Sequence, residues 1–189
     1  MNRAELEHAI RASCDALGVR EVIVVGSQAV LGPFPDAPRE LRTSAEADVW
    51  ADELDDLEVA KLNSLGYGSR FHEEFGFHID PVGPETATLP PDWRERAVVV
   101  EVEGHGARGI CPEAHDLAVS KLVRGAEKDL AFVGAMLFHR MIQPSVVARR
   151  IDELADLDEE RVMRIHGALR SAQQRARDRR SRRRRGLAP

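Results

Sequence analysis

The sequence has few cysteines and lacks the spacings by which cysteine or histidine binds zinc. Among 189 residues only Cys14 and Cys111 are cysteines, and no Cys-x-x-Cys pair occurs. The seven histidines show neither His-Glu-x-x-His nor His-x-His spacing, which argues against a zinc site. A chain of this length can bury a proper core without disulfides. We therefore expect reduced thiols and a cytoplasmic protein.

Long apolar runs are also missing. No stretch of 18 apolar residues occurs, and the first seven residues carry acids and no apolar segment. These absences predict neither a membrane-spanning helix nor a signal peptide.

Charge is distributed unevenly along the chain. The net charge is −5, but residues 175–185 hold eight arginines and one aspartate, so the rest of the chain is near −12. Such a basic segment fits binding to a polyanion such as RNA, or pairing with the acidic body. A solvated chain end is the alternative, and the arginines could also continue the last predicted helix.

The apolar pattern predicts an α+β fold in which a mixed β-sheet is flanked by helices, with a helical C-terminal part. We expect a core over residues 1–111, helices over 112–174 and a flexible basic tail over 175–189. Short β-branched runs predict strands at 21–25, 46–51, 75–82, 97–103 and 107–111. Apolar residues at steps of three or four predict helices at 2–17, 54–65, 112–124, 126–143, 145–155 and 158–175, and Ser27 to Leu31 as the first turns of another.

Two carboxylates one residue apart give the clearest sign of chemistry. On a strand, Glu46 and Asp48 point to the same face and can reach one point in space. Like charges held that close favour a divalent cation between them. A Gly26-Ser27 turn ahead of a helix start offers backbone N–H groups and a helix dipole to a phosphate. Each feature alone is common, since an acidic edge strand can simply be solvated, but together they predict a nucleoside triphosphate site.

Further motifs follow in order, and the set resembles the nucleotidyltransferase superfamily of the minimal and AbiE type, which includes the MenT toxins. The resemblance extends over residues 22–133. It departs from the family where Glu46 stands for the usual first aspartate, and where a proline-rich stretch at 32–38 lengthens the loop. The matching segments are Gly26-Ser27, Arg42-Thr-Ser-Ala-Glu-Ala-Asp48, Asp80, His115 to Lys121, and Glu127-Lys-Asp129.

The resemblance implies a role for each matching residue. It implies that Glu46, Asp48 and Asp80 bind Mg²⁺ or Mn²⁺, with Asp80 also a candidate base. It implies catalytic roles for these three and Lys121, and nucleotide contacts from Gly26, Ser27, Arg42, Ser44, Lys121 and Asp129. Two alternatives stay open at this stage: Lys121 as an ordinary surface lysine, and Asp129 as a residue that orients Lys121, contacts the base or ribose, or caps the second helix.

Three functions follow from these expectations. The first is a metal-dependent enzyme that transfers a nucleotide from an NTP to a hydroxyl, such as a tRNA end, as the toxin of a toxin–antitoxin pair with an antitoxin protein as partner. The second is nucleotidyl or kinase-like transfer to a hydroxyl side chain of a protein. The third is a degenerate fold that binds a nucleotide or a partner without catalysis, which Glu46 motivates.

Overall fold

The computed structural model describes residues 1–51, 55–155 and 157–186. The chain forms two compact units, one of Met1–Ala87 with Trp93–Glu113 and one of Thr88–Asp92 with Ala114–Pro189. The predicted helix start at Leu54 and the last three residues of the predicted basic tail lie outside the described part.

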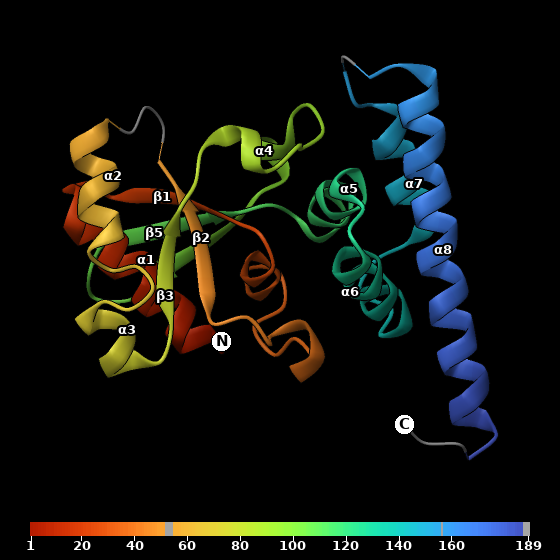
Figure 1. Ribbon diagram of the computed structural model, residues 1–189, viewed down its shortest axis with the longest axis horizontal. Coiled ribbons are helices and arrows are strands. Elements are labelled where there is room, and N and C mark those ends of the chain that lie inside the picture. The colour runs from red at the N-terminus through yellow and green to blue at the C-terminus, as the bar shows by residue number, and fades with distance from the viewer. Residues whose placement is uncertain (52–54, 156, 187–189) are drawn as a thin grey trace. The chain divides into compact units, whose positions relative to one another are not determined.

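The first unit is built on a five-stranded mixed sheet with the strand order β3-β2-β1-β5-β4 (Figure 1). Strand β1 is antiparallel to β2 and parallel to β5, while β2 and β3 are parallel and β4 and β5 are antiparallel. The predicted α+β fold is therefore confirmed. The strands are β1 (Glu21–Val25), β2 (Glu46–Trp50), β3 (His78–Pro81), β4 (Val98–Val102) and β5 (Ala107–Cys111).

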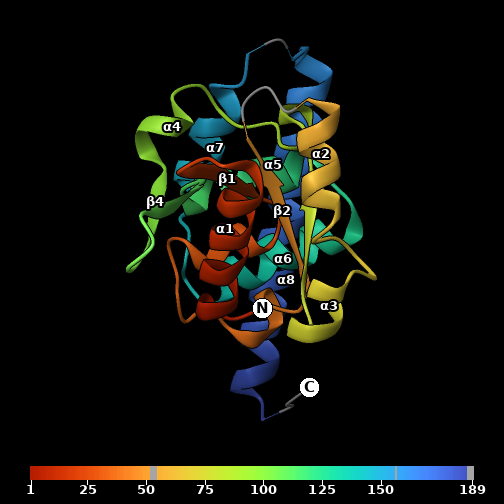
Figure 2. The same ribbon diagram turned by 90° about the vertical axis from the view of Figure 1, so that its left-hand side faces the viewer.

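Helices α1 (Arg3–Leu17) and α2 (Asp56–Asn63) lie across the same face of this sheet (Figure 2). Helix α1 begins at a capping box, in which Asn2 and Glu5 accept each other's backbone N–H groups, and it ends at Gly18 in the left-handed region. Its buried stripe includes Leu6 and Ile10, so the period of the helix turns its apolar side toward the strands.

Several short elements differ from the sequence predictions. The helix expected from Ser27 is a single 3₁₀ turn, η1 (Gln28–Leu31), because Gly32-Pro33 stops it. Two short helices, α3 (Arg70–Phe75) and α4 (Trp93–Arg96), fall where no helix was predicted. Helix α3 takes the start of the strand predicted at 75–82, since Ser69 caps it and Gly76 ends it. Further 3₁₀ turns are η2 (Arg39–Leu41) and η3 (Pro84–Thr86).

The second unit is helical, as predicted. Pro144 occupies the first turn of α7, where its missing N–H costs nothing, and Asp158 caps α8 by accepting the backbone N–H of Arg161 at 2.7 Å. The long helix α8 packs along α6 (Figure 1). The helices are α5 (Ala114–Arg124), α6 (Glu127–Phe138), α7 (Pro144–Asp152) and α8 (Glu159–Arg184).

Helix α8 continues without a break through the arginine-rich segment. Ala176 is buried, Arg175 pairs with Glu127 at 2.8 Å, and Arg180 donates to the carbonyl oxygen of Leu137 at 2.6 Å. Residues 175–184 of the predicted basic tail thus continue the last helix and pack against α6.

Two further predictions concern the membrane and the thiols. No helix in the described ranges combines the length and the apolar character needed to cross a bilayer. Cys14 and Cys111 are free thiols, as expected, and both are buried. Burial raises the pKa of Cys111 to about 12, so this thiol stays protonated and packs as a small apolar side chain.

Candidate functional site

Gly26 and Asp48 meet at the end of β1. Val25 pairs with Asp48 across the antiparallel strands, so the next residue, Gly26, lies beside the aspartate side chain. An ideal Cβ at Gly26 would overlap Oδ2 of Asp48, and Gly26 has a φ of 68°. Glycine is thus required by the backbone and by the carboxylate together. The glycine turn and the acidic strand converge as the sequence predicted.

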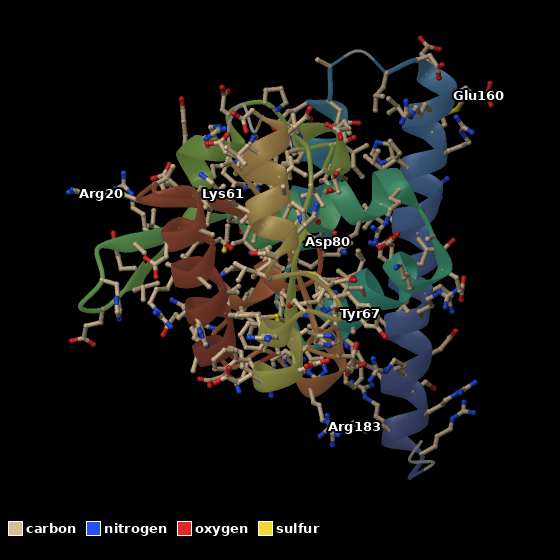
Figure 3. All side chains as sticks on the ribbon, turned by 60° about the vertical axis from the view of Figure 1, so that its left-hand side comes forward. Arg20, Lys61, Tyr67, Asp80, Glu160 and Arg183 are labelled. Carbon is tan, nitrogen blue, oxygen red and sulfur yellow. The ribbon has the colours of Figure 1, made fainter. Side chains whose placement is uncertain are left out.

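Asp80 lies next to Asp48 on the neighbouring strand. The parallel register of β2 and β3 pairs Asp48 with Asp80, and paired residues on strands about 4.8 Å apart present their side chains on one face. Asp48 is half-buried and Asp80, which Figure 3 labels, is exposed. Two carboxylates therefore stand side by side on one face of the sheet, next to the Gly26 turn.

Glu46 occupies a different place in this array. It pairs with His78 and not with Asp80, and it stands two residues before Asp48, about 6.6 Å along the strand. Among the described residues, no three His, Cys, Asp or Glu side chains are grouped so that they could hold a metal ion. The structure therefore pairs Asp48 with Asp80 but does not gather the predicted set of three ligands.

The pair of aspartates still fits a hard divalent cation. Mg²⁺ is commonly held by one or two carboxylates, while substrate phosphate oxygens and waters complete its octahedron. Asp48 and Asp80 supply such a pair on one face, beside the turn whose glycine leaves room for an aspartate oxygen. Two carboxylates this close repel each other, and a cation between them removes that repulsion.

The turn after Gly26 carries a polar side chain that the sequence analysis missed. Gln28 is 1% exposed, and within the described residues neither its amide oxygen nor its amide nitrogen has a hydrogen-bond partner. Its neighbours in η1, Ala29 to Leu31, are buried and apolar. A polar residue in such a run is the signal that could have singled it out, since buried amides are normally paired. Because η1 is one turn long, the predicted helix dipole is absent, and the Ser27 region offers only local N–H and amide groups.

Arg42 and Ser44 lie on the segment that leads into β2. The Ser44 hydroxyl accepts the backbone N–H of Glu46 at 3.2 Å, which fixes the start of the strand. Nε of Arg42 is buried and has no hydrogen-bond partner in the described part of the chain. Ser44 thus forms a local hydrogen bond that stabilises the start of β2. The buried Nε–H of Arg42 is a hydrogen-bond donor that a bound ligand would satisfy.

A ring cluster borders the two strands. The Tyr67 ring lies 4.9 Å from His72 and 5.5 Å from His78 between centroids, and Tyr67 is 82% exposed. His78 lies opposite Glu46 in the register. Figure 3 labels Tyr67 in the turn that precedes α3. No motif in the sequence pointed to Tyr67.

Lys121 and Asp129 come together in the helical unit. Lys121 is 4% exposed, and its Nζ lies 3.8 Å from Oδ1 of Asp129, which is 1% exposed. Asp129 also accepts hydrogen bonds from Nε of Arg124 at 2.7 Å and from the backbone N–H of Ala126 at 3.2 Å. The surface alternative for Lys121 is therefore wrong, and Asp129 both positions the lysine and caps α6.

Comparison with known proteins bears on the resemblance. No curated protein and no solved structure matches the chain. A family model described as "Nucleotidyltransferase of unknown function (DUF6036)" matches residues 5–177. This match supports the nucleotidyltransferase superfamily but does not assign the AbiE or MenT subtype. Because it covers most of the sequence, the chain belongs to this DUF6036 family of nucleotidyltransferases.

Proposed function

We propose that the protein transfers a nucleotide from an NTP to a hydroxyl acceptor, with Mg²⁺ or Mn²⁺ as cofactor. The observation that carries the proposal is the in-register pair of Asp48 and Asp80 beside the Gly26 turn. This arrangement puts two acceptor-only side chains next to backbone N–H donors, which is the pairing of charges that a triphosphate with its cation requires.

Each carboxylate has a separate role in the proposed nucleotidyl transfer. In this proposal the acceptor hydroxyl oxygen forms a bond to the α-phosphorus, the bond from the α-phosphorus to the bridging oxygen breaks, and pyrophosphate leaves. Asp80, the more exposed of the pair, would accept the hydroxyl proton at a carboxylate oxygen. Asp48 and Asp80 would hold the cation, with Glu46 as a further candidate; the bound ion would neutralise charge on the reacting oxygens.

Other residues would bind the nucleotide. The N–H groups of Gly26 and Ser27 and the amide of Gln28 would contact phosphate or sugar oxygens, and the guanidinium of Arg42 would add a charged donor near Ser44. Lys121, whose Nζ lies 3.8 Å from Oδ1 of Asp129 within the helical unit, stays a nucleotide contact that the resemblance implies. The unpaired amide of Gln28 supports this assignment, because a bound nucleotide would satisfy it.

An RNA hydroxyl, such as the end of a tRNA, is the proposed acceptor. The basic helix α8 supports it, since arginines attract the phosphates of RNA. The toxin role, with an antitoxin protein as partner, belongs to the same proposal and depends on the AbiE and MenT resemblance. Induced expression should then arrest growth, whereas expression of an Asp48→Ala variant should not.

The transfer is tested with labelled NTPs, Mg²⁺ or Mn²⁺, and total tRNA. We expect label in the RNA with the wild type and a loss of about 100-fold or more with Asp48→Ala, because the variant removes a ligand of the proposed ion. Glu103→Ala removes an exposed carboxylate in the β4–β5 turn and should leave the rate unchanged. Equal labelling by the wild type and Asp48→Ala would contradict the proposal, and label found on protein by intact mass would replace RNA with a protein acceptor.

Two observations favour a second candidate, a module that binds nucleotide without catalysis. Glu46 replaces the usual first aspartate, and the described residues contain no group of three potential metal ligands. Nucleotide binding that is tight without Mg²⁺, with no transfer to RNA or protein, would support this candidate over the enzyme.

A further inference from the structure

A basic pocket lies within the helical unit, between the end of α5 and the first half of α8. Its volume is about 500 Å³, which is within the usual range of small-ligand sites. Its walls include Leu122, Arg124 and Gly125 from the α5 end and Arg161, Arg164 and Ile165 from α8.

Three guanidinium groups line this pocket, and two of them have no acidic partner within the described ranges. Arg124 is paired with Asp129. Arg161 and Arg164 are exposed and stand three residues apart on α8, so their side chains are neighbours. Among the described residues no carboxylate forms an ion pair with either side chain, and nearby Asp158 caps the helix. The pocket therefore presents two exposed positive charges that attract an anion.

The pocket also has an apolar wall. Leu122 and Ile165 are 2% and 3% exposed and form part of the lining. A planar guanidinium binds a phosphate through two parallel hydrogen bonds and can also stack on a base. A phosphate with an attached sugar or base matches arginines beside an apolar surface better than a bare carboxylate does.

The pocket is lined by the first half of α8, a strongly basic helix. From Arg161 to Arg184, α8 carries ten arginines and a single carboxylate, Asp178. Figure 3 labels Glu160 near the start of this helix and Arg183 near its end, and the sequence turns from acidic to basic just after Glu160. A polyanion that entered the pocket would find further positive charge along the same helix, which favours a nucleic acid strand over an isolated phosphate compound.

We propose that the pocket between α5 and α8 binds a phosphate group of an RNA strand, with the adjoining sugar or base against Leu122 and Ile165. The inference rests on the proposed function for the choice of RNA, since RNA is the acceptor there. Arg161 and Arg164 are the main phosphate contacts, and Arg124, held by Asp129, closes the third side.

The test measures binding of fluorescent tRNA to the full chain by anisotropy, at about 50–200 mM salt. Arg161→Gln with Arg164→Gln should weaken binding by about tenfold and lower the salt slope by about 1 to 2, as expected for the loss of one or two phosphate contacts. The matched control is Arg170→Gln with Arg177→Gln, which removes the same charge at exposed positions of the same helix outside the pocket lining. The control should lose less than about threefold, and circular dichroism should show both variants folded.

Three results would overturn the inference. Equal losses in the pocket and control variants would show only general attraction to a basic helix. Loss of NTP binding with tRNA binding intact would assign the pocket to the nucleotide. Competition by polyglutamate as strong as competition by unlabelled tRNA would point to an acidic protein. Since tRNA binding is measured without catalysis, failure of nucleotidyl transfer would remove the proposed function and leave this result standing.

Discussion

At the scale of single residues, Gly26 determines where the carboxylate of Asp48 lies. Its positive φ and its contact with Oδ2 of Asp48 both exclude a side chain. Gly18 has a similar φ of 72°, but an added Cβ there would meet no atom within 4 Å. Substitutions at the two glycines therefore distinguish the effect of backbone strain from the effect of displacing the aspartate side chain.

We expect Gly26→Ala and Gly18→Ala each to lower the free energy of unfolding by about 1–2 kcal/mol through the left-handed backbone. Only Gly26→Ala should also abolish nucleotidyl transfer, because the methyl group pushes the Asp48 carboxylate away. Denaturant unfolding and the transfer assay check both effects. Normal activity in folded Gly26→Ala protein would contradict the proposed position of Asp48.

Gln28 gives a second prediction at this scale. Its buried, unpaired amide is a cost in the nucleotide-free protein. Replacing it with methionine, which has a similar shape and no amide, should raise the melting temperature and weaken NTP binding. Calorimetry and thermal melting measure the two effects. A lower melting temperature with unchanged affinity would mean that Gln28 has a structural role only.

At the scale of elements, His8 links α1 to the α3 region. Its ring lies 5.3 Å from Phe71, 4.3 Å from Phe75 and 5.7 Å from Phe77 between centroids. Burial lowers the pKa of His8 below its ordinary 6.5; the Arg11 charge adds to this effect and Glu74 opposes it. The folded protein therefore keeps this ring neutral at a pH where the unfolded chain already binds a proton.

The lowered pKa of His8 makes the folded protein less stable as the pH falls. Well above pH 6.5 His8 is neutral in both states. As the pH falls through 6.5 the unfolded state gains protons first, so the folded state loses stability. We expect the melting temperature to fall less from about pH 7.5 to about pH 5.5 in His8→Phe than in the wild type. His105→Gln, which removes an exposed histidine from the β4–β5 turn, should behave as the wild type does. If the melting temperature of His8→Phe fell with pH as much as that of the wild type, His8 would not contribute to the pH dependence.

The junction of α5 and α6 depends on a buried charge cluster. Asp129 forms ion pairs with Lys121 and Arg124 and caps α6. Asp129→Asn keeps the size but removes the carboxylate that pairs with the buried Lys121 and with Arg124, which should cost about 3–5 kcal/mol. Asp158→Asn makes the same change at the exposed cap of α8, where asparagine caps as well as aspartate, and should cost almost nothing. Chemical denaturation compares the two, and equal small losses would contradict the role of the cluster.

At the scale of the whole molecule, strong local patterns were predictable and pairings between distant segments were not. The β-branched run of β1 and the helical periodicity of α1 are both clear in the sequence, and both elements were found. The short helix α3 has no apolar stripe long enough to detect. Gly32-Pro33 indicated a stop, but the sequence could not show that η1 would end after one turn.

The candidate site shows the same division. Alternation along β2 predicted that Glu46 and Asp48 share a face. It could not give the register that pairs Asp48 with Asp80 and leaves Glu46 opposite His78, because that register depends on how β2 and β3 align. The sequence likewise left open whether Lys121 is exposed or oriented by Asp129, because Asp129 lies beyond the break between α5 and α6.

The most direct measurement is calorimetric titration of a non-hydrolysable NTP analogue into the full chain with and without Mg²⁺. The proposal predicts that binding requires Mg²⁺ in the wild type and is lost in Asp48→Asn, which keeps the side-chain shape but removes the charge. Glu103→Gln should bind as the wild type does. Equal binding with and without Mg²⁺, or full binding by a folded Asp48→Asn protein, would contradict a metal and nucleotide site at Asp48 and Asp80.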